Sequence, residues 1–138
     1  MMSEWDNVND ITLFALCLWG EARGEPIESK VACGNVIWNR HTLWGKPLRD
    51  VILRPKQFSC FNEGDPNLNK IRSIRDNEDL NDKAYWECYW VAYGIMYNYL
   101  SDNTKGATHY HTIACDPTWD DHMIKTATYG KTEFFREA

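Results

Sequence analysis

The sequence predicts a mainly α-helical protein, α+β at most, that folds as a single domain over residues 1–138. Apolar residues recur at the three- and four-residue spacing of a helix before residue 40 and again after residue 82, whereas extended patterns occur only beyond Gly106. A chain of 138 residues is the size of one ordinary domain, and its 43% hydrophobic and 25% charged residues are typical of globular proteins.

The first helix is expected to begin near Asn9 and to end near Trp19 or Glu21. Residues that can cap its start are followed by apolar residues at helical spacing: Asp6, Asn7, Asn9 and Asp10, then Ile11, Phe14, Ala15 and Leu18. Residues that break helices come next, namely Gly20, Gly24 and Pro26. Glu21 is therefore expected at a helix end, beside a turn.

A second helix is predicted from Pro26 to Asn39. Its apolar residues should face inward and its charged residues outward: Ile27, Val31, Val36 and Ile37 inward, and Glu28, Lys30 and Arg40 outward. Pro47 suits the first turn of a short third helix. Residues 57–69 are predicted to be irregular, because glycine and proline mark turns there.

The clearest long helix should begin after residue 81 or 82, end at residue 99 or 100, and lie at the centre of the fold. One face of this helix carries recurring large residues: Tyr85, Cys88, Tyr89, Ala92, Met96 and Tyr99. Beyond Gly106 the chain is expected to be irregular or weakly extended, through residues 107–112 and again over 126–135.

The charge pattern argues against nucleic acid as a partner. The formal net charge is -5, and lysine and arginine do not cluster as phosphate binding requires. The N-terminus carries Glu4 and Asp6 instead of a basic start and an apolar run, so no secretory signal is visible. No stretch approaches the roughly 20 apolar residues of a membrane span. We expect a monomer that is made in the bacterial cytoplasm and does not insert into membranes.

The five cysteines are scattered, odd in number and without a C-x-x-C pair, so we interpret them as mostly buried thiols of a reducing cytosol. Aromatic residues make up 14% of the chain, including seven Trp and seven Tyr. Such a content suits a groove that stacks against sugar rings, and an aromatic core explains it equally well.

Glu21 has the features of a general acid for glycosidic bond cleavage. That reaction needs a carboxyl group that is still protonated near neutral pH, which usually means a glutamate in a partly apolar site. Glu21 follows Leu18 and Trp19 at a helix C-terminus, where the negative end of the helix dipole favours the neutral acid. The competing interpretation is that Glu21 and Glu25 are solvated acids paired with Arg23.

Four stretches of the sequence resemble the signature blocks of the SleB-type cell wall hydrolases, the family of spore-cortex-lytic enzymes and some phage endolysins. They are WGEARGE at 19–25, GNVIWNR at 34–40, QFSC at 57–60 and ATHYH at 107–111. Their order and separation are similar to the family's, and the resemblance spans about 11–135. Four ordered motifs are far more specific than any one of them.

The resemblance implies an α-rich, lysozyme-like and lytic-transglycosylase-like domain with Glu21 as the catalytic acid. It implies cleavage of peptidoglycan glycan strands between N-acetylmuramic acid and N-acetylglucosamine. Other family members often carry a separate wall-binding domain, and none is expected in this chain. A leaderless catalytic domain resembles a phage endolysin, which acts on the wall after release from the cytoplasm. One departure is that the family usually shows Gly-x-His near its end, whereas this chain has Gly130, Lys131 and Thr132.

Two mechanisms of glycosidic bond cleavage are compatible with Glu21 as the catalytic acid. Ordinary hydrolysis needs a second carboxylate, and the sequence offers several without an obvious choice: Glu25, Glu63, Asp65, Asp116 and Asp120. A lytic transglycosylase needs only one, because the substrate's own 6-hydroxyl attacks the anomeric carbon and a 1,6-anhydro ring forms. The resemblance favours the second mechanism, and a hydrolytic muramidase is the alternative.

Other residues of the motifs are expected to shape a substrate groove. The expected substrate-binding residues are Gln57, Phe58, Ser59, Asn62, Thr108, Tyr110 and Trp119. The expected supporting residues are Glu25, Arg40, His109 and His111. No cofactor and no metal ion are expected.

Two other classes of protein compete with this interpretation. A metal-dependent hydrolase is suggested by His109 and His111, which are two residues apart and could ligate zinc with His122 or nearby aspartates, although no H-E-x-x-H pattern is present. A non-catalytic saccharide-binding module would need only the aromatic residues.

Overall fold

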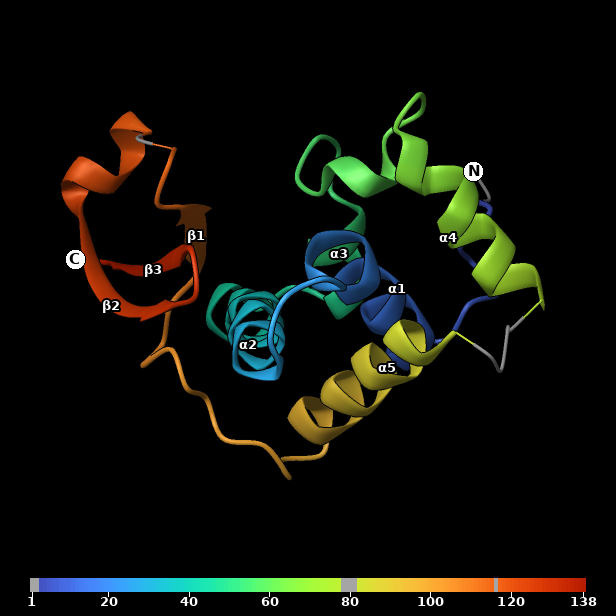
Figure 1. The fold of residues 1–138 in the computed structure, drawn as a ribbon, viewed down its shortest axis with the longest axis horizontal. Helices are drawn as coiled ribbons and strands as arrows, with labels where there is room; N and C mark the ends of the chain where they lie inside the picture. The colour runs from blue at the N-terminus through green and yellow to red at the C-terminus, as the bar shows by residue number, and fades with distance from the viewer. Residues whose placement is uncertain (1–2, 78–81, 116) are drawn as a thin grey trace.

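The computed structural model describes residues 3–77, 82–115 and 117–138. In chain order the elements are α1 (Asp10–Ala22), α2 (Ile27–Trp44), α3 (Leu48–Leu53), η1 (Ser59–Phe61), α4 (Pro66–Asn77), α5 (Lys83–Met96), β1 (His109–Thr112), η2 (Thr118–His122), β2 (Met123–Tyr129) and β3 (Thr132–Glu137). A helical body carries a small sheet on one side, with α4 at the far side (Figure 1). The predicted mainly α fold, with α+β as its limit, is confirmed.

α1 is the central helix of the body. Every residue from Leu13 to Trp19 is buried, and α2, α3, α4 and α5 all pack against this helix. The predicted N-cap is confirmed, because the Asn9 side chain accepts a hydrogen bond from the Thr12 amide at 2.9 Å. The helix of residues 83–96 was expected to be central; α5 packs against α1 and α2 with one face and leaves Trp90, on the other, 62% exposed.

Gly20 was predicted to break the first helix. It lies inside α1, which continues past it to Ala22. A Cβ atom at Gly20 would come within 2.6 Å of Cys60 Sγ, closer than real atoms approach. The missing side chain therefore lets η1 pack against the last turn of α1, where Glu21 lies.

α2 is longer than predicted and buries charged residues that were expected to face solvent. Lys30 and Arg40 are each only 4% exposed, whereas Ile27, expected to face inward, is 46% exposed. The reason is that α5 and the sheet cover two sides of α2, so polar positions are enclosed and find long-range partners. Glu28 is exposed as predicted.

α4 contradicts the prediction that residues 57–69 are irregular, because it begins at Pro66. Asp65 accepts a hydrogen bond from the Asn67 amide at 2.8 Å, and proline suits the first helical position. Leu68, Ile71 and Ile74 then recur on the buried face. Residues 57–65 include only the short helix η1.

α5 begins at its predicted cap, since Asp82 accepts from the Tyr85 amide at 2.8 Å. It ends at Met96, earlier than predicted, because the Gly94 carbonyl accepts from the amides of Tyr99 and Leu100 and the chain folds back. Tyr99, expected on the buried face, is consequently 75% exposed. Asn81, the other residue after which this helix was predicted to begin, lies outside the described residues.

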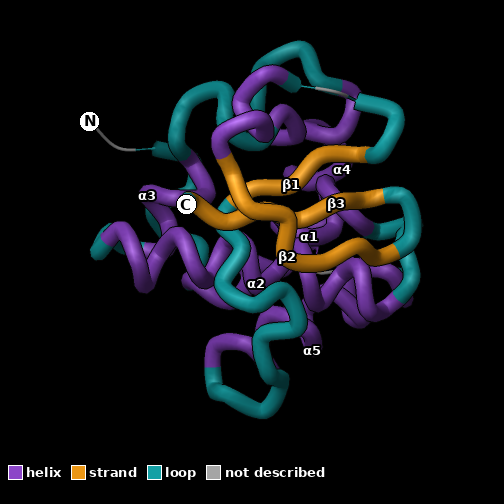
Figure 2. The backbone as a smooth tube through the Cα atoms, turned by 90° about the vertical axis from the view of Figure 1, so that its left-hand side faces the viewer, coloured by secondary structure: helices purple, strands orange, loops and turns teal. Residues whose placement is uncertain are grey.

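The sheet has the order β1-β3-β2, with both pairs antiparallel. Its strands lie side by side across the helices (Figure 2). The weakly extended character expected for residues 107–112 and 126–135 is thus largely β-strand, and Phe134 anchors the sheet in the core. All five cysteines are free thiols, and only Cys115 is exposed. None of the described helices is long and apolar enough to span a membrane.

Candidate active site

Glu21 lies in the last turn of α1, just before the chain turns into α2. Its carboxyl group is partly buried and opens into a hollow of about 370 Å³. The wall of the hollow comes mainly from the turn itself: Gly20, Ala22, Arg23, Gly24, Glu25 and, from α4, Asn67. Glu21 therefore lies at a helix end beside a turn, as the sequence predicted.

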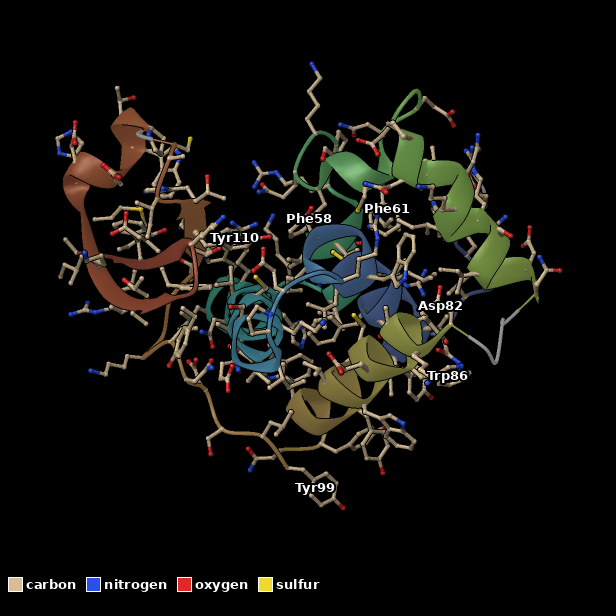
Figure 3. All side chains as sticks on the ribbon, viewed as in Figure 1. Phe58, Phe61, Asp82, Trp86, Tyr99 and Tyr110 are labelled. Carbon is tan, nitrogen blue, oxygen red and sulfur yellow. The ribbon has the colours of Figure 1, made fainter. Side chains whose placement is uncertain are left out.

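Tyr110 of β1 holds the carboxyl group of Glu21 from the side of the sheet. Its phenol donates a hydrogen bond to Glu21 Oε1 at 2.8 Å. In Figure 3 Tyr110 lies between β1 and the helical body, on the side of the strand that faces α1. Residues 89 positions apart in the sequence therefore meet at one oxygen atom.

Burial raises the pKa of Glu21 above its ordinary value, and its neighbours modify that shift. The Tyr110 hydrogen bond and the positive charge of Arg40 lower this pKa, whereas the negative charge of Asp65 raises it. The result is a raised pKa, so the neutral acid persists to higher pH than for a solvated glutamate. This is the protonation state that a general acid requires.

Arg40 is a buried cation beneath the site. Its Nε donates to the Thr108 carbonyl at 2.6 Å, while Nη1 has no protein partner. The guanidinium lies 5.4 Å from the Trp44 ring centre and 5.7 Å from that of Phe58. Burial lowers the pKa of Arg40, yet its charge still acts on Glu21.

Lys30 fixes the turn that follows Glu21, a role that its sequence position did not indicate. The ammonium donates to the Glu25 carbonyl at 2.7 Å and pairs with Glu87 at 2.8 Å. Glu25 itself lies near Gly130 at the tip of the β2–β3 hairpin. The ion pair to Glu87 on α5 is a long-range contact, so the spacing of residues around Lys30 could not reveal it.

Arg23 does not pair with Glu21 or Glu25, which the competing interpretation required. Its guanidinium donates to the Trp19 carbonyl at 3.2 Å and to Asn67 at 2.9 Å, and it lies 4.0 Å above the Trp19 ring. It thereby ties the end of α1 to α4.

The residues expected to bind substrate differ in how far they are exposed. Phe58 and Thr108 are each 3% exposed, so they pack inside the protein and the expectation that Phe58 offers a face to sugars is wrong. Ser59 begins η1, Asn62 follows its last residue, and Gln57, which precedes η1, lines a second hollow. Trp119 is 38% exposed and packs against His109, His111 and Phe135.

Both ring nitrogens of His111 are engaged by hydrogen-bond acceptors. Nε2 lies 2.8 Å from Asp120 Oδ2 and Nδ1 lies 2.7 Å from the Thr112 carbonyl. His109 contacts the Thr108 hydroxyl at 2.9 Å. Across the described ranges, no group of three or more His, Cys, Asp or Glu residues has the arrangement of a metal site.

The proposed second carboxylates are widely dispersed. Glu63 pairs with Arg72 at 2.6 Å, and Asp120 is bonded to His111. The negative charge of Asp65 acts on Glu21. Asp116 lies outside the described residues. Thr132, at the departure from the family pattern, is buried in β3 opposite Thr112.

A helical body, a small antiparallel sheet and one enclosed acid between them define the lysozyme-like class of folds. The model of the cell wall hydrolase family matches residues 24–135, so the chain belongs to this family. The match begins after Glu21 and does not test its role.

Relatives and solved structures agree with this assignment. Spore cortex-lytic enzymes of Oceanobacillus iheyensis and Bacillus subtilis are each 43% identical over 58 residues, which is 41% of this chain. The chain matches only about a fifth of those relatives, 21% and 19% of their lengths.

The catalytic domain of the Bacillus cereus SleB protein superposes with a TM-score of 0.62 at 26% identity, over 92% of this chain and 89% of that one. The catalytic domain of the germination-specific lytic transglycosylase SleB from Bacillus anthracis gives the same TM-score at 24% identity, over 98% and 100%, and shows the fold alone.

Proposed function

We propose that this protein cleaves peptidoglycan glycan strands between N-acetylmuramic acid and N-acetylglucosamine, with Glu21 as the general acid. The observation that carries the proposal is a single partly buried carboxyl group, with a raised pKa and a fixed hydrogen bond from Tyr110, that opens into a hollow. Membership of the cell wall hydrolase family supports peptidoglycan as the substrate.

In the first step neutral Glu21 protonates the bridging glycosidic oxygen. Tyr110 donates to Oε1, so the acidic proton belongs on Oε2, the oxygen left free for the substrate. As the bond from the anomeric carbon to the bridging oxygen breaks, Glu21 becomes a carboxylate. Tyr110 and Arg40 stabilise that charge, because both lower the pKa of Glu21.

In the second step Glu21 acts as a base. The 6-hydroxyl oxygen of the muramic acid attacks its own anomeric carbon and passes its proton to Glu21, which closes a 1,6-anhydro ring and regenerates the acid. This lytic transglycosylase route needs no other carboxylate at the reacting atoms.

A hydrolytic muramidase is the second candidate function, with Asp65 as its second carboxylate. The negative charge of Asp65 acts on Glu21 and raises the pKa of that carboxyl group. In that mechanism Asp65 would activate water, and the products would carry ordinary reducing ends.

Digestion of purified peptidoglycan, with mass spectrometry of the released fragments, tests reaction, residue and mechanism together. Wild type should release anhydro products, and Glu21→Gln should lose at least about 100-fold in rate, which is the typical contribution of a general acid. Glu28→Gln is the matched control, since Glu28 is exposed on α2. Binding without any turnover by wild type would instead indicate a saccharide-binding module.

Asp65→Asn separates the two mechanisms. Asparagine can still accept the hydrogen bond from the Asn67 amide, so the start of α4 should persist. A transglycosylase should keep forming anhydro products in this variant. Reducing-end products from wild type that disappear in Asp65→Asn would establish hydrolysis.

The biological setting is a separate proposal. We propose a phage endolysin that acts as a monomer, without a cofactor, on the host wall after release from the cytoplasm, in keeping with the endolysins that the family includes. The spore cortex-lytic relatives favour the spore cortex as the second candidate. Comparing initial rates on vegetative sacculi and on isolated cortex decides between them, because an endolysin should cut vegetative walls at least as fast.

A further inference from the structure

A second hollow, of about 420 Å³, lies beside the loop that packs against the Glu21 turn. Trp44, Lys46, Arg54 and Gln57 line it, together with Asp50 and three apolar residues of 51–55. Gln57 is three residues before Cys60, whose sulfur packs against Gly20 next to Glu21. Three residues span at most roughly 10 Å, so the Gln57 edge of the hollow lies within about that distance of the contact between Cys60 and Gly20.

The charge of this hollow differs from that of the protein as a whole. The chain carries a net charge of -5, whereas the hollow places two cations, Lys46 and Arg54, against the single carboxylate of Asp50. Neither cation has an ion-pair partner among the residues that the structure describes. Unpaired cations at the rim of a groove attract anionic groups of a ligand.

Arg40 adds to the positive potential of this hollow, because it lies against Trp44, one of the lining residues. Its guanidinium lies 5.4 Å from the ring centre of Trp44, and the charge of Arg54 acts on it unfavourably. Nη1 of Arg40 is buried without a protein partner. An anion bound beside Trp44 would relieve the repulsion between the two guanidinium groups.

We propose that this hollow is a subsite for a carboxylate of the peptide stem of the glycan strand, an inference that rests on the proposed function. A stem of four residues extends to roughly 13 Å from its sugar, so the proposal places a stem carboxylate at Lys46 and Arg54 while its muramic acid is held at Glu21. Arginine pairs with a carboxylate through two parallel hydrogen bonds, and lysine adds a point charge. The enzyme consequently selects strands that carry charged peptide stems.

The test compares initial rates on native strands and on strands whose stem carboxylates have been converted to amides, after removal of wall phosphate polymers. Wild type should cut native strands roughly three- to tenfold faster, as expected for two solvent-exposed ion pairs. The double variant Lys46→Gln/Arg54→Gln should reduce this preference to near unity. Lys70→Gln/Lys83→Gln, with the same change of charge at exposed sites on α4 and α5, should retain it.

Four results overturn the subsite, of which three concern the stems themselves and the fourth concerns wall phosphate polymers. The first three are equal wild-type rates on native and amidated strands, an unchanged preference in the Lys46/Arg54 double variant, and the same preference for strands stripped of stems, which carry only the lactyl carboxylate. A preference that appears only when phosphate polymers are left on the wall also overturns it.

Binding separates failure of this inference from failure of the proposed function. Glu21→Gln should bind a soluble disaccharide tetrapeptide more tightly than the bare disaccharide, and the Lys46/Arg54 substitutions should abolish that difference. Absence of cleavage by wild type removes the proposed reaction but leaves this binding difference measurable. Absence of the binding difference removes the subsite alone.

Discussion

At the scale of single residues, the chemistry depends on how one carboxyl group is enclosed. Burial of Glu21 favours its neutral form, and Tyr110 and Arg40 favour its ionised form. A general acid that later acts as a base needs both influences, because it must hold a proton before the bond breaks and carry a charge afterwards. The three residues come from α1, β1 and α2, so the balance exists only in the folded protein.

Tyr110→Phe should lower kcat by about 10- to 100-fold, the value of one hydrogen bond to a charged group. It should also move the alkaline limb of the pH–rate profile to higher pH. The sign follows because Tyr110 stabilises the Glu21 carboxylate, so losing it raises the pKa of Glu21 further, and the acid stays protonated to higher pH.

Tyr129→Phe is the matched control for Tyr110→Phe. Like Tyr110, Tyr129 lies in the sheet and donates a phenol hydrogen bond to another segment, at 2.6 Å to the Asn103 carbonyl. Asn103 is distant in sequence from Glu21. An alkaline limb that stayed in place in Tyr110→Phe, with kcat reduced, would assign Tyr110 a merely structural role.

At the scale of elements, η2 is held to β1 through the ring of His111. Both ring nitrogens face acceptors, so both carry protons in this arrangement. Burial lowers the pKa of His111, but the Thr112 carbonyl and Asp120 outweigh this effect, and the pKa is raised above its ordinary value of 6.5. The stacked Phe135 ring, 4.9 Å away, completes the attachment.

Asp120→Asn should destabilise the protein at pH 5.5 by roughly 1.5 kcal/mol and have little effect at pH 8.5. The raised folded-state pKa of His111 contributes stability that is fully present below pH 6.5 and is lost as the pH rises through the folded value. Urea unfolding at both pH values measures the difference. Asp121→Asn, an exposed neighbour, should be neutral at both, and an equal loss at both pH values in Asp120→Asn would refute the ionic attachment.

Elements with local signals could be predicted from the sequence, and those set by distant contacts could not. The Asn9 and Asp82 caps act within three residues, so both helix starts were correct. The start of α4 also had a local signal, in Asp65 and Pro66, but the proline was interpreted as a turn. The end of α5 depends on Leu100 packing against Gly94, which helical periodicity does not encode.

The candidate site divides in the same way. Glu21 could be selected because its motif and its helix end are local. The hydrogen bond of Tyr110 to Glu21 crosses 89 positions, and that of Arg40 to Thr108 crosses 68, so neither partner follows from spacing along the chain. Arg40 and Lys30 were placed outward for this reason, because a lysine or arginine is solvated unless a partner encloses it.

At the scale of the whole molecule, the site lies at the junction between the helical body and the sheet. α2 makes the polar connections: Asn39 donates to the Ala107 carbonyl at 2.9 Å, and Arg40 donates to the Thr108 carbonyl at 2.6 Å. These bonds lead directly into β1, which begins at His109 and carries Tyr110. The position of the sheet on the body therefore controls the distance between Tyr110 and Glu21.

Arg40→Met should loosen the sheet while leaving the helical body folded. Methionine fills much of the buried volume but leaves the Thr108 carbonyl without its donor, which costs about 1–3 kcal/mol. Amide hydrogen exchange should accelerate in β1 and β3 more than in α1, where every residue from Leu13 to Trp19 stays enclosed by other helices. Arg136→Gln, at an exposed position of β3, should leave both rates unchanged. Uniform acceleration across α1 and β1 would instead mean that body and sheet open as one cooperative unit, with Arg40 supporting the whole core and not this junction.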